Sequence, residues 1–390
     1  MIKYPYARPN VTSNDVIAVV KAMKNQFLTD GEIIKSFEND LSKAFKVKNS
    51  IVCNSGTAAL HLIYKSLGLK KGDGILTTPI TFLATANAAK MCDANVYFSD
   101  VDPNTGLMIP ELIEEKLKNK KLKIKIVTIV HLGGRICNLE KISIITKKYK
   151  CFLVEDACHA PGAIYKTRNK QTTRVGSCKY SIASSFSFHA IKHITMGEGG
   201  CITTNNDNLS KKLKLKRSHS MQKNKKNIFN KPWYYEIEEL GWNYRASEIN
   251  CALGRSQLKR LSKILKTREK IAELYYKELH KFKYIEFPKN AFKPNSNAWH
   301  LFTILIDFKK YNLKRSNIIM QLEKKGIGSQ VHYIPIFNQP FYKTKNKENF
   351  NGSLEYYEKN LSLPMYETLN RENVKFISNA LKKIITKSLK

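Results

Sequence analysis

The sequence has no apolar run that approaches the roughly 20 residues of a membrane-spanning helix. Its first ten residues, MIKYPYARPN, lack the apolar core of a secretory signal peptide. The chain has 390 residues and 42% apolar content, which is enough to bury a large core in two domains. We therefore expect a cytoplasmic protein without a membrane partner.

Closely paired cysteines are also missing. The eight cysteines are scattered along the chain, and none of them forms a CxxC pair. Zinc sites and the disulfide frameworks of small proteins depend on such spacing. The pattern predicts reduced thiols and no metal site.

Acidic residues are scarce beside basic ones. The chain has 32 Asp and Glu against 67 Lys and Arg, a formal net charge of +35. Such an excess invites a nucleic-acid hypothesis, but the basic residues are spread along the chain and no nucleic-acid-binding motif accompanies them. General surface basicity is the favoured interpretation, so we expect no nucleic-acid partner. A non-catalytic regulatory or nucleic-acid-binding protein is the less favoured alternative.

Short apolar strand-like runs alternate with amphipathic helical patterns over the first two thirds of the chain. This alternation predicts an α/β fold with a mostly parallel sheet covered by helices on both faces. The runs are SIVCN (50–54), ILTT (75–78), NVYFSD (95–100), KIKIVTIVHL (123–132), CFLVED (151–156) and GGCITTN (199–205). Ligands of such sheets bind at the carboxyl ends of the strands.

The pattern changes after about residue 260, where strands are expected at 300–308 and 329–335 between long helices. We predict a large domain over 1–258, with an N-terminal arm, and a smaller α+β domain over 259–390.

A Ser-Gly-Thr sequence stands between the first strand and the helix AALHLIYKSLG. Gly56 lets the backbone approach a ligand closely, and the N–H groups that follow open a helix whose positive end suits a phosphate. Gly56 and Thr57 are therefore candidate phosphate contacts.

The stretch SFSFHAIKHITMGEGG (185–200) presents one lysine between a strand-like run and a glycine-rich turn. An exposed surface charge is the usual role of a lysine. A lysine sheltered from water has a lowered ammonium pKa, and its amine becomes a usable nucleophile. The surrounding small, polar and glycine residues suit a ligand-contacting turn, so Lys192 is the candidate catalytic residue.

Asp156 follows the apolar run CFLV, so its carboxylate should be partly buried and should need a partner. A protonated pyridine nitrogen would be such a partner, and the ion pair would keep the ring an electron sink. An ordinary capping aspartate at the end of a strand is the alternative.

Four motifs occur in one order along the chain: SGT (55–57), EDACHA (155–160), FSFHAIK (186–192) and GWNYR (241–245). In them, and over essentially its whole length, the chain resembles the sugar-nucleotide aminotransferases of the DegT/DnrJ/EryC1/StrS family. The resemblance implies a fold-type-I aminotransferase that binds pyridoxal 5′-phosphate, linked to Lys192. It also implies a homodimer with shared active sites and L-glutamate as amino donor. The dehydratase subgroup carries histidine in place of this lysine, so Lys192 argues against it.

Further segments resemble the branch that makes the precursor of pseudaminic acid: GSCKYS (176–181), GIGSQVHYIPI (326–336) and SLPMYETLN (362–370). This resemblance implies transfer of an amino group to C4 of UDP-2-acetamido-2,6-dideoxy-β-L-arabino-hexos-4-ulose. The product would be UDP-4-amino-4,6-dideoxy-N-acetyl-β-L-altrosamine. Another nucleotide-linked keto sugar is the alternative acceptor.

The resemblance also assigns roles to single residues. It places Asp156 on the pyridinium nitrogen, His159 against the ring or its hydroxyl, and the aromatic ring of Phe82 on the pyridine face. It gives the cofactor phosphate to Gly56, Thr57, Ser187 and, from the partner subunit, the side chain at Asn243. For His159 and Phe82 the alternatives are structural roles, and for Asn243 the alternative is a helix-entry cap.

Two residues are candidates for the sugar-nucleotide pocket. Tyr6 lies in a segment that resembles the family's N-terminal arm, and a packing role is its alternative. His332 lies in the GIGSQVHYIPI segment, and a core histidine is its alternative.

The chain departs from the family pattern at three places. His193 stands where proline or asparagine is common, HLGGR (131–135) replaces an alanine-glycine pair, and KTRNKQTTR (166–174) is longer than the usual turn. We expect 166–174 to form a surface hairpin away from the chemistry.

Overall fold

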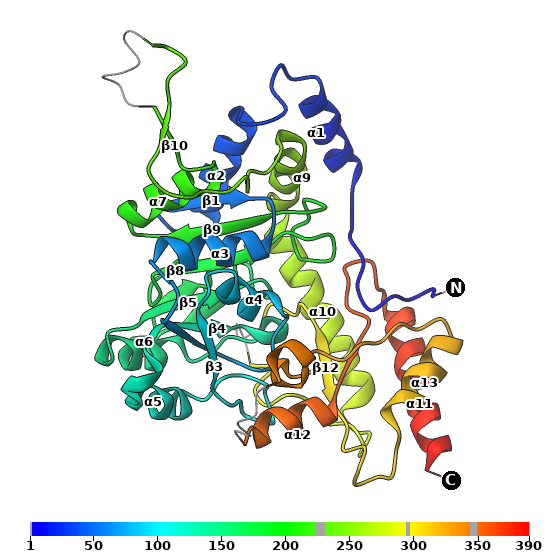
Figure 1. The fold of residues 1–390 in the computed structure, drawn as a ribbon. Helices are drawn as coiled ribbons and strands as arrows, with labels where there is room; N and C mark the ends of the chain where they lie inside the picture. The colour runs from blue at the N-terminus through cyan, green and yellow to red at the C-terminus, as the bar shows by residue number, and fades with distance from the viewer. Residues whose placement is uncertain (1, 224–230, 294–296, 344–348, 390) are drawn as a thin grey trace.

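The computed structural model describes residues 2–223, 231–293, 297–343 and 349–389, and Figure 1 shows a seven-stranded sheet at its centre. The strand order is β1–β9–β8–β5–β4–β2–β3. The strands are β1 (Asn49–Cys53), β9 (Gly200–Thr204), β8 (Ala183–Ser187), β5 (Phe152–Asp156), β4 (Ile124–Val130), β2 (Gly74–Thr77) and β3 (Asn95–Phe98). Within this sheet only β9 runs antiparallel to its neighbours. The predicted mostly parallel sheet is confirmed.

The central strands send alternate side chains to opposite faces of the sheet, as strand geometry requires. Ile126 and Val154 pack into a core under one set of helices, and Val127 and Leu153 pack into a core under another. The first face is covered by α3 (Gly56–Ser66), α4 (Ala84–Lys90) and α7 (Asp207–Arg217), and the second by α2 (Glu32–Phe45), α5 (Pro110–Lys118), α6 (Leu139–Lys148) and α9 (Glu248–Leu258). Figure 1 shows helices on both sides of the sheet.

Helix starts in the first half of the chain follow local capping chemistry. The Oγ of Ser55 accepts a hydrogen bond from the N–H of Ala58 at 3.0 Å, so α3 begins at Gly56. The side chains of Thr12 and Asp15 form a capping box, so α1 (Ser13–Met23) begins directly after Thr12.

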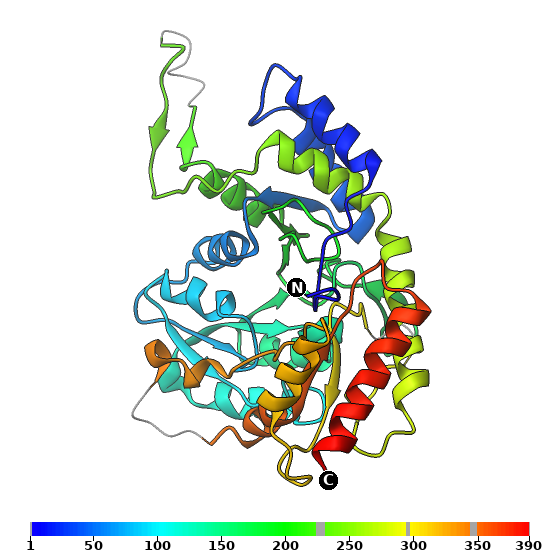
Figure 2. The same cartoon turned by 90° about the vertical axis from the view of Figure 1, so that its right-hand side faces the viewer.

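The C-terminal part of the chain builds a second apolar core around the antiparallel pair β12 (Phe302–Leu305) and β13 (Asn360–Leu363). The helices of this part are α10 (Leu261–Leu279), α11 (Arg315–Lys324), α12 (Asn351–Lys359) and α13 (Arg371–Ser388). Figure 2 shows α10 and α13 running side by side. The predicted division between residues 258 and 259 stays a prediction.

The strand expected over 329–335 is wrong, because this segment makes only a single bridge, from Gln330 to Ser362. The N–H of Val331 donates to the side chain of Gln330, and the N–H of His332 donates to the side chain of Asn360. Pro335 has no N–H to donate. Side chains therefore take the donors that a strand ladder would need.

Residues 166–174 form the expected hairpin, with strands β6 (Ile164–Lys166) and β7 (Thr172–Arg174). A second hairpin, β10 (Met221–Gln222) with β11 (Glu236–Ile237), projects from the same end of the molecule as α1 in Figure 2. Among the described residues, no helix is both long and apolar enough to span a bilayer.

Candidate active site

The predicted phosphate contacts meet where β8 ends and α3 begins. Ser187 is the last residue of β8, and Gly56 is the first residue of α3. A Cβ atom on Gly56 would lie 2.9 Å from the Cβ of Ser187, so glycine is needed at this approach. Thr57 lies in the same first turn, half-buried. The helix N terminus and the Ser187 side chain thus form one cradle for an anion.

Asp156 ends the neighbouring strand β5 and is only 6% exposed. Its Oδ2 accepts a hydrogen bond from the Thr85 hydroxyl at 2.7 Å, and its Oδ1 accepts one from the N–H of Cys158 at 3.3 Å. In the described part of the chain, no Lys, Arg or His nitrogen lies within 4.0 Å of this carboxylate. A buried carboxylate held only by neutral donors can accept a cationic ligand atom.

Lys192 lies five residues beyond the end of β8, with its Nζ 3.5 Å from the Nε2 of His300. Burial lowers the pKa of the Lys192 ammonium, and the positive charge of Arg268 lowers it further. The negative charge of Asp156 opposes this shift, and a thiolate at Cys158 would do so as well. Burial raises the pKa of the Cys158 thiol well above its usual value, so Cys158 is not itself a competing nucleophile.

Three buried histidines surround the lysine: His159, His193 and His300. Burial, followed by the charge of Lys192 or Arg268, holds the pKa of each imidazole well below its usual value. The Nδ1 of His159 accepts a hydrogen bond from the N–H of Gly133 at 3.2 Å. All three imidazoles are therefore neutral at pH 7, and they shelter Lys192 without adding charge.

The remaining predicted residues meet around Tyr333, which the sequence did not single out. The ring centroid of Phe82 lies 6.2 Å from that of Tyr333, and Phe82 is 58% exposed. The ring of Tyr6 lies 5.6 Å from that of His332, which in turn lies 4.9 Å from that of Tyr333. The Tyr333 hydroxyl lies 3.4 Å from the Nε2 of His159. These aromatic side chains join the lysine site to the N-terminal arm.

His332 is buried, and its Nδ1 lies 2.9 Å from the hydroxyl of Ser362. Burial lowers its pKa to about 3, with a further contribution from the charge of Lys192. This bond fixes the ring in the C-terminal core, and Tyr6 and Tyr333 lie beside it. The core-histidine alternative is compatible with this bond, and the predicted ligand contact of His332 stays a prediction.

Asn243 has an exposed side chain, and its carbonyl accepts a hydrogen bond from the Asn54 side chain at 3.4 Å. The cap of α9 is Ser247, whose Oγ accepts from the N–H of Asn250. The helix-cap alternative for Asn243 is therefore wrong. Its backbone lies beside the loop that leads to Gly56, and its side chain is free to contact a second subunit.

Three residues of the site were missed. Thr85 follows Thr81 by one helical turn, and their hydroxyls lie 3.0 Å apart, so the spacing was a usable signal. Tyr333 directly follows His332 in a segment that was already singled out. Nothing local marked His300, because it reaches Lys192 from a segment 108 residues away.

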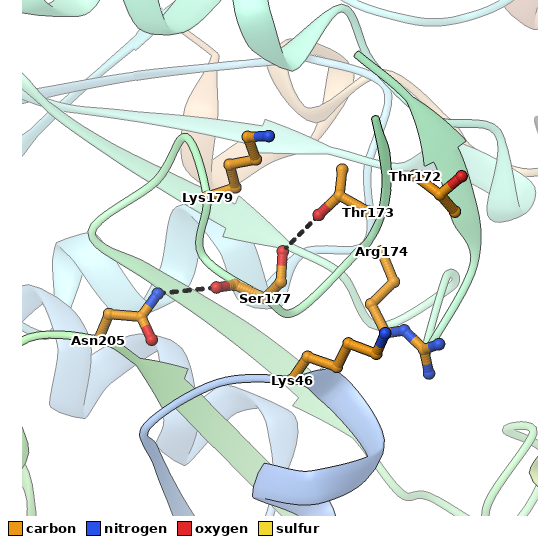
Figure 3. A pocket seen from close by; sticks show the side chains of 7 residues that line it. All are labelled: Lys46, Thr172, Thr173, Arg174, Ser177, Lys179 and Asn205. Atoms are coloured by element: carbon orange, nitrogen blue, oxygen red, sulfur yellow. Dashed lines mark hydrogen bonds between the residues drawn. The ribbon is translucent and has the colours of Figure 1, made fainter. Parts of the chain in front are cut away.

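A separate cavity of about 350 Å³ lies near the opposite ends of the strands, before β1 and β8 and after β9 (Figure 3). Its lining residues are Lys46, Thr172, Thr173, Arg174, Ser177, Lys179 and Asn205. None of the predicted site residues lines it, and the hairpin 166–174 supplies part of its wall. The hairpin is therefore remote from Lys192, as expected.

The sheet and the site together have the form of an enzyme active site, with a sheltered lysine amine as the candidate catalytic group and a buried carboxylate close enough to influence its pKa. The chain belongs to the DegT/DnrJ/EryC1/StrS aminotransferase family, whose family model matches residues 9–382. It is 38% identical to the UDP-4-amino-4,6-dideoxy-N-acetyl-beta-L-altrosamine transaminase of Campylobacter jejuni, over 98% of this chain and 97% of that protein. It is 34% identical to the Helicobacter pylori protein of the same name, over 98% of each chain.

A solved structure agrees with these sequence matches. Helicobacter pylori PseC, an aminotransferase involved in the biosynthesis of pseudoaminic acid, superposes with a TM-score of 0.90 at 31% identity. The match covers 98% of this chain and 99% of that one. The predicted family, fold and enzyme class are confirmed.

Proposed function

We propose that the chain is a pyridoxal 5′-phosphate-dependent aminotransferase that moves the amino group of L-glutamate to C4 of UDP-2-acetamido-2,6-dideoxy-β-L-arabino-hexos-4-ulose. The product is UDP-4-amino-4,6-dideoxy-N-acetyl-β-L-altrosamine. One observation carries the proposal: Lys192, Asp156 and the Gly56 cradle converge in a chain that is 38% identical to a transaminase named for this product. The predicted cytoplasmic location stays a prediction.

The residues present fit the cofactor. The carboxylate of Asp156 is buried without a cation from the described protein, as a partner of a pyridinium nitrogen must be. Gly56 brings the N terminus of α3 close to Ser187, so backbone N–H groups and a hydroxyl are available together for a phosphate, and the exposed ring of Phe82 offers a flat surface for the pyridine. When bound, the cofactor supplies an electron sink for the carbanion at the amino-acid α-carbon.

The protein residues position the reactants and move protons. Burial keeps the pKa of Lys192 lowered, so its Nζ can take a proton from the donor's α-carbon and later return one to the acceptor's C4. Asp156 keeps the ring nitrogen protonated, and its own position is fixed by Thr85. The neutral imidazoles of His159 and His300 exclude water beside the amine without opposing its protonation cycle.

We propose a homodimer in which Asn243 reaches the phosphate of the partner subunit. Apolar side chains lie exposed along α1 and after it, namely Val16, Ile17, Val20, Met23, Phe27 and Leu28. Trp233, Tyr235, Ile237 and Leu240 lie exposed on and beside the hairpin β10–β11. Large exposed apolar groups favour burial against another protein surface. Asn243 is itself exposed, which is what a contact to the partner requires.

The decisive experiment supplies the purified enzyme with L-glutamate and a panel of nucleotide-linked 4-keto and 3-keto sugars. We expect 2-oxoglutarate release to be fastest with the β-L-arabino-4-ulose and the product to carry its amine at C4. Faster turnover with a different keto sugar would assign the enzyme to the alternative acceptor. No turnover with any keto sugar would reject the function.

A further inference from the structure

His300 is the site residue for which the family motifs provided no role. It is 3% exposed, and its Nε2 lies 3.5 Å from the Nζ of Lys192. Its Nδ1 has no hydrogen-bond partner in the described chain. The ring centroid lies 4.3 Å from that of His159, with the two rings tilted by 31°. The Nε2 that faces the lysine amine is therefore held in place by packing of the ring and by the backbone of His300.

Arg268 of α10 fixes that backbone. Its Nη1 donates to the carbonyls of Trp299 at 3.1 Å, His300 at 3.4 Å and Met365 at 3.3 Å. The side chain is buried, and no carboxylate within the described residues lies within 4.0 Å of its guanidinium. A buried cation is costly unless its donors are used. Here Nη1 is used to hold the chain at the position where His300 points to Lys192, whereas Nε has no hydrogen-bond partner among the described residues.

The loop HLGGR supplies a second anchor. The N–H of Ala298 donates to the carbonyl of Gly134 at 2.9 Å, and the N–H of Leu301 donates to that of Gly133 at 3.2 Å. Gly134 has a φ of +103°, and a Cβ there would lie 2.8 Å from the nitrogen of Trp299. Only glycine allows this approach. The loop 131–135, where the chain departs from the family pattern, is thus the surface against which the segment with His300 packs.

The other two imidazoles already have partners. The Nε2 of His193 donates to the carbonyl of Ala298 at 2.8 Å. The Nδ1 of His159 accepts from Gly133, and its Nε2 lies 3.4 Å from the Tyr333 hydroxyl. Of the three, only His300 has a ring nitrogen within hydrogen-bonding distance of Lys192.

We propose that His300 is a positioning residue for Lys192: its Nε2 accepts a hydrogen bond from the lysine amine and holds that amine at the reacting carbon whenever it is not bonded to the cofactor. Arg268 and the loop 131–135 fix His300 for this purpose. The inference rests on the proposed function for its catalytic consequence. A lysine side chain rotates freely about four bonds, and fixing its end in a reactive geometry is a large part of what an active site contributes.

The test compares His300→Phe, which keeps the ring volume and removes the acceptor, with His300→Gln, whose side-chain amide reaches about as far as Nε2. Acetic anhydride at trace concentration labels Lys192 in the cofactor-free protein across a range of pH. Mass spectrometry measures the extent of labelling, and the labelling midpoint is the pH at which it is half-maximal. A neutral acceptor stabilises an ammonium, so we expect the midpoint of His300→Phe to fall by about half to one pH unit. We expect His300→Gln to retain most of the wild-type value.

Steady-state kinetics gives the second readout. We expect kcat of His300→Phe to fall about 10- to 100-fold, with KM for both substrates within about threefold, because positioning acts on the bound state. His300→Gln should recover most of kcat. The control is His280→Phe, an exposed histidine at the end of α10, which should change neither readout.

An unchanged labelling midpoint in folded His300→Phe would overturn the proposal. So would equal losses in His300→Gln and His300→Phe, because a purely structural role does not distinguish an acceptor from a phenyl ring. The labelling experiment needs neither cofactor nor substrate. An enzyme that failed on every keto sugar would therefore reject the proposed function and leave the labelling result on His300 intact.

Discussion

Asp156→Asn keeps the shape of the side chain and removes its charge, which makes it the sharpest test of the cofactor site. The carboxylate is 6% exposed, and its hydrogen bonds come from Thr85 at 2.7 Å and the N–H of Cys158 at 3.3 Å. Within the described chain it has no ion-pair partner. On the proposed function, a bound pyridinium would supply the opposite charge, so the substitution should act mainly on the loaded enzyme.

The size of the effect follows from the burial of the pair. Two unit charges about 4 Å apart interact by about 4 kcal/mol at an effective dielectric constant of about 20. A loss of about 4 kcal/mol from the transition state corresponds to about a 1,000-fold slower reaction. In the cofactor-free protein, asparagine leaves one hydrogen-bond donor unpaired, which costs about 1 to 3 kcal/mol of folding free energy. This cost is offset because a buried negative charge is removed. The stability change should therefore be small.

The assay is the first half-reaction, in which the loaded enzyme meets L-glutamate in a single turnover and the release of 2-oxoglutarate is followed. We expect a rate about 1,000-fold below wild type, with the thermal midpoint of the cofactor-free protein shifted by only a few degrees. Asp207→Asn, at an exposed carboxylate at the start of α7, is the matched control. A rate within tenfold of wild type in folded Asp156→Asn would refute the pairing of Asp156 with the pyridinium.

Four further outcomes are expected. Lys192→Ala should lose overall activity, and borohydride should no longer fix pyridoxal phosphate to the chain; covalent cofactor on another lysine would contradict the assignment. Gly56→Ala places a Cβ 2.9 Å from the neighbouring serine, so the Kd for the cofactor in an absorbance titration should rise at least about tenfold, and an unchanged Kd would argue against the cradle. Mixing Lys192→Ala subunits with Asn243→Ala subunits should restore one intact site in each mixed dimer. Verified mixed dimers without regained activity would contradict the proposed contact of Asn243 with the partner's site. Burial lowers the pKa of His61 to about 4 and of His332 to about 3, so the unfolded chain binds these protons first as the pH falls. Unfolding free energy should then drop between about pH 6.5 and pH 4, by up to about 1.4 kcal/mol per pH unit for each histidine, and urea midpoints that stay level over this range would show that other groups compensate.

The sequence was sufficient to propose the residues of the cofactor side of the site, and to predict that they lie at one edge of the sheet, because the relevant signals are local. Asp156, Ser187 and Gly56 each stand at the end of an apolar strand or directly after one, and a parallel sheet brings such positions to one edge. Lys192 was recognisable from the glycine-rich turn that follows it. Residue type and spacing along the chain were enough in each case.

The substrate side could not be predicted in the same way, because its residues come together only through tertiary packing. His300 and Tyr333 lie in the C-terminal part and reach Lys192 and His159 across 108 and 174 residues. The expected strand over 329–335 failed because side-chain acceptors took the backbone donors there. Arg268 gave no signal, since a lone arginine on a helix is usually a solvated one.

The difference between the cofactor side and the substrate side of the site bears on which residues select the sugar. On the proposed function, Asp156, Ser187 and Gly56 contact the cofactor, which is the same whatever the acceptor, so they would not distinguish one keto sugar from another. Tyr333 contacts Phe82 and His159, and it lies beside His332, which contacts Tyr6 of the N-terminal arm, so we expect the acceptor to pack against this group of rings. The Tyr333 hydroxyl lies 3.4 Å from the Nε2 of His159, and the ring of His159 lies 4.3 Å from that of His300. We therefore expect a substitution of Tyr333 to alter the choice of sugar before it alters binding of the cofactor, whereas a substitution of Phe82 should alter both.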